Sequence, residues 1–125
     1  MEHITIYKEA QIEKVRLAAQ AAAQVLARLC DAVQPGMTPL DLIRETGGRS
    51  GSLNYCGYPR QVCISLNDEV VHGIGRADRI IQFGDLVSID VVVELGGYYG
   101  DNARTVCAGG DPDPLSARLR AAGCA

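Results

Sequence analysis

The sequence predicts an α+β fold in which one long helix packs on a mainly antiparallel sheet. Apolar residues recur at helical spacing over about 25 positions near the N-terminus. A continuous β-branched apolar run follows at residues 86–93, and the two-residue signal Gly96-Gly97 joins it to a further extended segment. A chain of 125 residues suits one domain or part of one.

The long helix is predicted over residues 8–33. Its apolar positions are separated by steps of three and four, which places them on one helical face. The start has no favoured N-cap residue, whereas Pro35-Gly36 ends the helix. The predicted apolar face consists of Ile12, Val15, Ala19, Ala22, Leu26, Leu29 and Val33.

A second, short helix is predicted to begin after Thr38. Thr38 is a good N-cap, Pro39 suits the first helical position, and Asp41 favours the first turn. Gly47-Gly48 limits its length. Residues 47–57 are rich in glycine and serine, so a loop is expected there.

Three strands are expected. Residues 61–66 form the first, and residues 86–93, after the turn at Phe83-Gly84-Asp85, form a central strand buried on both faces. A two-residue loop at Gly96-Gly97 returns the chain as a partner strand over residues 98–108. The tail from residue 111 has little to bury.

Asp90 stands inside the apolar central strand, where an ionised carboxylate needs a compensating partner. The hairpin supplies one. With Gly96 and Gly97 as the loop, Asp90 faces Ala103 and Asp101 faces Val92. Asp90 and Asp101 are then diagonal neighbours on one face, with Cα atoms roughly 7–8 Å apart.

Two carboxylates without a thiolate suit a hard or borderline cation such as Mn, Mg, Fe(II) or Co(II). Two aspartates do not fill a coordination shell, so further ligands must come from elsewhere. The alternatives stay open at this point: Asp101 after Gly100 also suits a strand end, and Asp90 also suits a buried, hydrogen-bonded carboxylate.

Other side chains admit both a structural and a functional interpretation. His72 is either an ordinary histidine beside apolar residues or a donor to a carbonyl or oxyanion. Tyr55, Tyr58 and Cys63 bracket a predicted turn at residues 57–60. They either pack in the core or line a pocket for a sulfur-containing side chain.

Composition excludes some classes of partner. The net charge of −3 and the absence of a basic patch argue against nucleic acid. The N-terminus has no signal-peptide pattern, and the longest apolar tract is broken by polar residues, which argues against a membrane span. Five cysteines without a C-x-x-C pair favour a reducing, cytoplasmic setting.

Residues 54–74, NYCGYPRQVCISLNDEVVHGI, residues 84–91, GDLVSIDV, and Gly100-Asp101 resemble type I methionine aminopeptidases of the M24 metallopeptidase family. The resemblance runs from about residue 4 to 109 and includes the spacings between His72, Asp90 and Asp101. It implies the N-terminal half of a pita-bread (creatinase/aminopeptidase-like) fold. Residues 1–110 would be that half, and residues 111–125 the start of a truncated connection to the second.

The resemblance also implies chemistry: removal of the N-terminal methionine from nascent proteins by metal-assisted hydrolysis. Asp90 and Asp101 would hold two divalent ions of unfixed identity (Co, Mn, Fe, Zn or Mg). His72 would contact substrate, and Tyr55, Tyr58 and Cys63 would line the methionine pocket. Nascent-chain peptides are the expected partners, with the ribosome a further candidate, and the full enzyme is expected to be a monomer.

The sequence departs from the family pattern in two ways. The second helix is shorter, and the further histidine and glutamate ligands have no counterpart here, so residues 1–125 alone are expected to be an inactive fragment. One alternative is a non-catalytic module of this fold that binds peptide N-termini or a protein partner. Another is a half-enzyme completed by a second chain.

Overall fold

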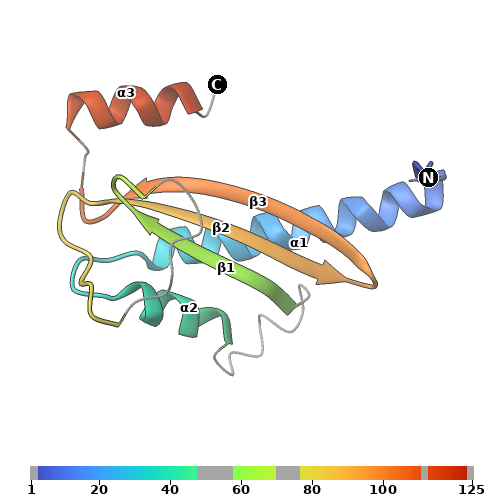
Figure 1. Cartoon of the computed structure of the whole chain (residues 1–125), viewed down its shortest axis with the longest axis horizontal. Coiled ribbons are helices and arrows are strands. Elements are labelled where there is room, and N and C mark those ends of the chain that lie inside the picture. The colour runs from blue at the N-terminus through green and yellow to red at the C-terminus, as the bar shows by residue number, and fades with distance from the viewer. Residues whose placement is uncertain (1–2, 48–57, 70–76, 111–112, 124–125) are drawn as a thin grey trace.

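The computed structural model describes residues 3–47, 58–69, 77–110 and 113–123. A long helix, α1, crosses one face of an antiparallel sheet, and a short helix, α2, lies beside it (Figure 1). The elements in chain order are α1 (Glu9–Ala32), α2 (Pro39–Gly47), β1 (Tyr58–Leu66), β2 (Leu86–Leu95), β3 (Tyr98–Cys107) and α3 (Pro114–Gly123).

Within the described ranges the sheet has the order β1-β2-β3, with both pairs antiparallel. β2 is therefore the central strand, as predicted. Gly96 and Gly97 form the two-residue loop between β2 and β3, with φ of 58° and 82°. Positive φ at both loop positions is the requirement of a hairpin turn whose twist matches its strands, and glycine meets it without strain.

The core lies between α1 and the sheet. Val87, Ile89, Val91 and Val93 of β2 alternate along the strand, and none has exposed surface. They belong to one apolar cluster that α1 and α2 complete on their side. Burial of each such side chain contributes roughly 1.5–3 kcal/mol. The contributions from the helices are Ala21, Ala22, Val25, Leu26, Leu29 and Leu42.

The extent of α1 was predicted closely, and its buried face was predicted in part. Ala22, Leu26 and Leu29 are buried as predicted. Ala18 and Val25 are also buried, whereas Ala19 is exposed. Ile12 is also 48% exposed, because the N-terminal turns extend past the β2–β3 hairpin (Figure 1). The helix start, predicted to lack a good cap, is closed by Gln11, whose side-chain oxygen accepts a hydrogen bond from the Lys8 backbone N–H at 2.9 Å.

Two strand predictions need correction. β2 is fully buried only on the α1 side, because the alternate residues of the strand remain half-buried. β1 starts at Tyr58 rather than at Gln61, so residues 58–60 are strand and not a turn. Pro59 is tolerated there because β1 is an edge of the described sheet, and the register shifts between Pro59 and Gln61.

Side-chain caps begin the two shorter helices. Thr38 Oγ1 accepts from the Asp41 N–H at 3.2 Å, and Asp41 Oδ2 accepts from the Thr38 N–H at 2.9 Å, which confirms the predicted start of α2. Asp113 caps α3 by accepting from the N–H groups of Leu115 and Ser116. The segment 48–57, predicted as a loop, lies outside the described residues.

Candidate metal centre

The two aspartates lie on the face of the sheet that turns away from α1, called the open face here. Asp90 is paired with Ala103, and Asp101 with Val92, which confirms the register predicted from the glycine pair. Because side chains alternate along a strand, Asp90 and Val92 share a face, and Asp101 joins them. Asp90 and Asp101 are therefore diagonal neighbours.

The two carboxylates differ in exposure. Asp90 lies in the middle of the central strand and is half-buried, and its Oδ1 atom is shielded from solvent. Asp101 lies on β3, at an edge of the described sheet, and is exposed. The pair thus combines Asp90, which has one oxygen shielded from solvent, with Asp101, whose carboxylate is accessible from solvent.

Polar groups surround the pair on the open face. Cys63 of β1 is paired with Asp90 and is half-buried. One row along the strands, Ser65 is paired with Ser88 and Ser88 with Thr105. The Ser88 and Thr105 hydroxyl oxygens are 2.8 Å apart and share a hydrogen bond. The open face of β2 thus carries polar groups around Asp90, whereas its α1 face is aliphatic.

The donor set of the pair fits a divalent cation in part. Two carboxylates on one face supply the oxygen ligands that Mn, Mg, Fe(II) or Co(II) prefer. Glu94 lies on the same face, two residues beyond Val92. Even so, among the described residues no three His, Cys, Asp or Glu side chains gather closely enough to enclose an ion. The described residues thus bring two carboxylates to one face of the sheet without enclosing an ion.

Comparison with known proteins extends this geometry. The model of metallopeptidase family M24 matches residues 13–122, which include both strands that carry the aspartates. The chain belongs to metallopeptidase family M24. Membership in a metallopeptidase family implies the use of divalent metal ions and confirms the family resemblance noted in the sequence.

Curated M24 relatives of this chain are named methionine aminopeptidases. Methionine aminopeptidase A of Synechocystis is 39% identical over 123 residues, an alignment that covers 93% of this chain and 48% of the relative. The methionine aminopeptidase of Aquifex aeolicus is 40% identical over 124 residues, which cover 88% of this chain and 48% of the relative. The chain spans about half the length of the curated relatives it matches.

A solved structure gives the same proportions. Methionine aminopeptidase from Thermotoga maritima superposes with a TM-score of 0.81 at 32% identity, over 95% of this chain and 50% of that protein. The prediction of an α+β fold that makes up about half of a pita-bread enzyme is confirmed by this match and by the long helix on its antiparallel sheet.

The remaining predicted site residues of this M24 chain are only partly described. Cys63 lies next to Asp90 on the open face, as stated above. Tyr58 begins β1, but its side chain lies outside what the structure describes. Tyr55 and His72 lie in segments 48–57 and 70–76, also outside the described residues. The roles assigned to these three therefore stay predictions.

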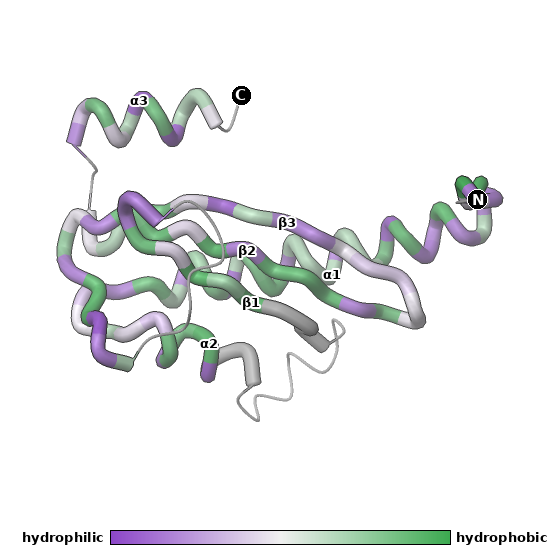
Figure 2. Tube along the Cα trace, viewed as in Figure 1, coloured by the Kyte–Doolittle hydropathy of each residue, from purple (hydrophilic) through white to green (hydrophobic). Residues whose placement is uncertain are grey.

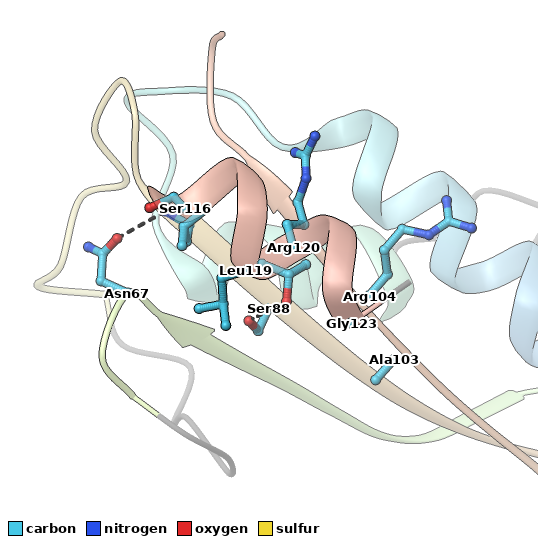
Figure 3. A pocket seen from close by; sticks show the side chains of 10 residues that line it. Asn67, Ser88, Ala103, Arg104, Ser116, Leu119, Arg120 and Gly123 are labelled. Atoms are coloured by element: carbon cyan, nitrogen blue, oxygen red, sulfur yellow. Dashed lines mark hydrogen bonds between the residues drawn. The ribbon is translucent and has the colours of Figure 1, made fainter. Parts of the chain in front are cut away.

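A space that the sequence did not predict lies between α3 and the open face. It has a volume of about 560 Å³ and is floored by Ser88, Ala103 and Thr105. In Figure 3, Leu119 of α3 points toward Ser88, whereas the guanidinium groups of Arg104 and Arg120 point away from the space. The floor includes Ala103, the partner of Asp90, so this space adjoins the carboxylate pair.

Helices long and apolar enough to cross a bilayer are absent from the part of the chain that the structure describes. Among the described residues, Cys30, Cys63 and Cys107 are not joined in disulfides. Burial raises the pKa of the Cys30 thiol, the charge of Arg104 lowers it by less, and the charge of Asp31 raises it further. Cys30 belongs to α1, so this thiol lies on the side of the sheet away from the aspartates.

Proposed function

We propose that residues 1–125 carry part of the active site of a methionine aminopeptidase, which removes the N-terminal methionine from nascent proteins. One observation carries the proposal. Asp90 and Asp101 are diagonal neighbours on the open face of a chain that is 39% identical to a methionine aminopeptidase over 123 residues. A paired carboxylate set on an M24 sheet is what a hydrolytic metal site needs.

In this proposal Asp90 and Asp101 hold the divalent metal ions, two in the complete site. When bound, the ions supply Lewis-acid polarisation of the scissile carbonyl. Asp90 is the more rigid ligand because it belongs to the central strand and has one shielded oxygen. Asp101, on an exposed edge, would bind from the side open to solvent.

Other residues of the chain would bind and orient the substrate. His72 would donate a hydrogen bond to the substrate carbonyl, and it would do so better as the transition state gains negative charge. Cys63, beside Asp90 on the open face, with Tyr55 and Tyr58 would line the pocket for the methionine side chain. Sulfur packs favourably on ring edges, so this set suits methionine.

The proposed setting is the cytoplasm, because the described cysteines are free thiols, as expected in a reducing compartment. The complete enzyme is proposed to act as a monomer on peptides with N-terminal methionine, with the ribosome as a further candidate partner. Residues 1–125 tested alone are expected to show no turnover, because two aspartates do not complete a hydrolytic site.

The first test measures metal binding and hydrolysis in the same preparation. Mn(II) binding is followed by loss of the free-ion signal in electron paramagnetic resonance, and hydrolysis is assayed on Met-Gly-Met-Met. Weak Mn(II) binding without turnover is expected, and Asp90→Asn and Asp101→Asn should each weaken binding at least about tenfold by removing a first ligand. Asp31→Asn, which removes one exposed carboxylate from α1, is the matched control.

One outcome would contradict the proposal, and another would contradict only the expectation that residues 1–125 are inactive alone. Equal Mn(II) binding in the wild type and in both aspartate variants would show that the pair is not a metal site. Hydrolysis by residues 1–125, abolished by Asp90→Asn, would keep the activity but overturn the expectation that this part is inactive alone.

A second candidate function is a module of the same fold that binds peptide N-termini without hydrolysis. The observation that favours it is that no third metal-binding side chain gathers with the aspartates among the described residues. Binding of Met-Gly-Met-Met in the presence of a chelator, measured by calorimetry, would support this module. Loss of peptide binding on chelation would favour the metalloenzyme.

A further inference from the structure

We infer that Gly100 is a positioning residue for the carboxylate pair: its missing side chain lets β3 rest on the backbone of α1, which fixes where Asp101 stands relative to Asp90. The inference rests on the proposed function only for the identity of what Asp90 and Asp101 bind, namely divalent metal ions. The contact itself involves the fold alone, so the two can be tested separately.

The evidence is the space that a side chain at residue 100 would need. A Cβ atom built on Gly100 would lie 2.1 Å from the carbonyl oxygen of Ala18, 2.5 Å from the carbonyl carbon of Ala18, and 2.8 Å from Cα of Ala19. All three atoms belong to the helix backbone, which cannot turn aside as a flexible side chain could. Any side chain at this position therefore has to separate β3 from α1.

Burial along β3 singles out the same residue. Gly100 is buried, whereas its neighbours Tyr99 and Asp101 are exposed. Gly100 is paired with Val93, which faces the core and has no exposed surface. Ala18 is likewise fully buried. β3 thus touches the helix at Gly100, and the alternation of the strand places Asp101 on the opposite, open face.

A side chain at residue 100 would displace β3 by more than a metal-binding pair of carboxylates tolerates. Real Cβ atoms essentially never come within 3.0 Å of such atoms, so a methyl group at residue 100 must move β3 by about 1 Å. β3 is an edge of the described sheet, so no further described strand resists this movement. Metal and catalytic constellations tolerate errors of about 0.5 Å. The sheet can therefore accommodate this displacement of β3, but the spacing between Asp90 and Asp101 changes by more than a metal site tolerates.

The test compares Gly100→Ala with a variant of equal stability loss elsewhere. Leu42→Ala is suitable, because Leu42 is fully buried in α2 on the α1 side of the sheet. Gly123→Ala is a second control, since a Cβ there meets nothing within 4 Å. Cross-strand nuclear Overhauser effects between β2 and β3 are measured without metal, and Mn(II) affinity is measured separately by electron paramagnetic resonance.

Gly100→Ala is expected to change the cross-strand effects and amide shifts around Asp101 and Val92 and to weaken Mn(II) binding at least about tenfold. Leu42→Ala, at a matched loss of melting temperature, should keep both. Wild-type cross-strand effects in Gly100→Ala, or an equal loss of Mn(II) binding in Leu42→Ala, would overturn the inference.

Two further measures keep the inference decidable. If the wild type binds no Mn(II), the proposed function fails, and the cross-strand effects alone decide the role of Gly100. If Gly100→Ala does not fold, Ala18→Val adds volume at the buried helix residue whose backbone meets Gly100, and trimethylamine N-oxide favours the folded state of both variants. Displacement of Asp101 in Ala18→Val would support the inference. Failure of both variants to fold under these conditions would overturn it, because the contact would then be purely structural.

Discussion

The two faces of β2 have opposite characters although they alternate residue by residue. On the α1 side, Val87, Ile89, Val91 and Val93 have no exposed surface. On the open side, Ser88, Asp90, Val92 and Glu94 are half-buried. Figure 2 shows the neighbouring strand β3 as more hydrophilic than the C-terminal half of β2. One strand therefore packs one set of residues into the core and places the other set, which includes Ser88, Asp90 and Glu94, on the open face.

Substitutions on the two faces of β2 are expected to have different effects on stability. A change on the α1 side removes packing that the whole domain shares, whereas a change on the open side alters local polar contacts. Since domains are stable by only about 5–15 kcal/mol, the first kind of change should remove a large part of the free energy of unfolding and the second should remove little. Paired substitutions at adjacent residues test this directly.

The largest difference is expected between Val91→Asp and Val92→Asp. Val91→Asp places a carboxylate in the α1-facing core, where desolvation costs several kcal/mol, so unfolding is expected. Val92→Asp adds the same group one residue on, on the open face opposite Asp101, where like charges destabilise by about 0.2–1 kcal/mol. Urea unfolding followed by circular dichroism measures both. Comparable stability in the two variants would show that the faces are not distinct.

A smaller contrast is expected between Ile89→Ala and Ser88→Ala. Ile89→Ala leaves a cavity beside α1 and should lower the free energy of unfolding by about 2–5 kcal/mol. Ser88→Ala removes the hydrogen bond to the Thr105 hydroxyl, for an expected loss of about 1 kcal/mol. The same urea titration decides between them. A loss in Ser88→Ala as large as that in Ile89→Ala would show that the open face is also a core.

The sequence predicted the register of the β2–β3 hairpin correctly. A two-residue glycine loop leaves one register, and the period of two then determines which residues share a face, so the placement of Asp90 and Asp101 followed. Burial of β2 on both faces was wrongly predicted. Leu86 and Val92 are apolar residues on the open face, and hydropathy cannot show which face the described helices cover.

Other features depend on tertiary contacts that no local pattern contains. The contact of Gly100 with α1 requires the crossing point of a strand and a helix that are far apart in sequence. The prediction of the buried face of α1 missed Ala18 for the same reason, because the position of the sheet determines which helix residues are covered. The cap of α3 by Asp113 is local, and its Asp-x-x-Ser pattern could have been recognised.

The smallest predicted effect concerns α2, which brings Leu42 to the α1 side. Hydrogen bonds from the Thr38 backbone and hydroxyl lower the pKa of the Asp41 carboxyl, and Arg44 contributes less. A pKa that is lower in the folded state means that this contribution is present above the unfolded pKa. It is lost as the pH falls through the folded value, below about pH 4.

Wild type and Asp41→Asn are therefore expected to differ in stability at pH 6 and to converge as the pH falls below the unfolded pKa, which urea unfolding at a series of pH values measures. Because the Asp41 side chain is 45% exposed, the difference should be smaller than that from Ser88→Ala. Arg44→Gln is the control: it removes the ion pair with Asp41 but keeps the Thr38 hydrogen bonds, so most of the pH dependence should remain. A pH dependence that disappears in Arg44→Gln would assign the effect to the ion pair instead of the cap.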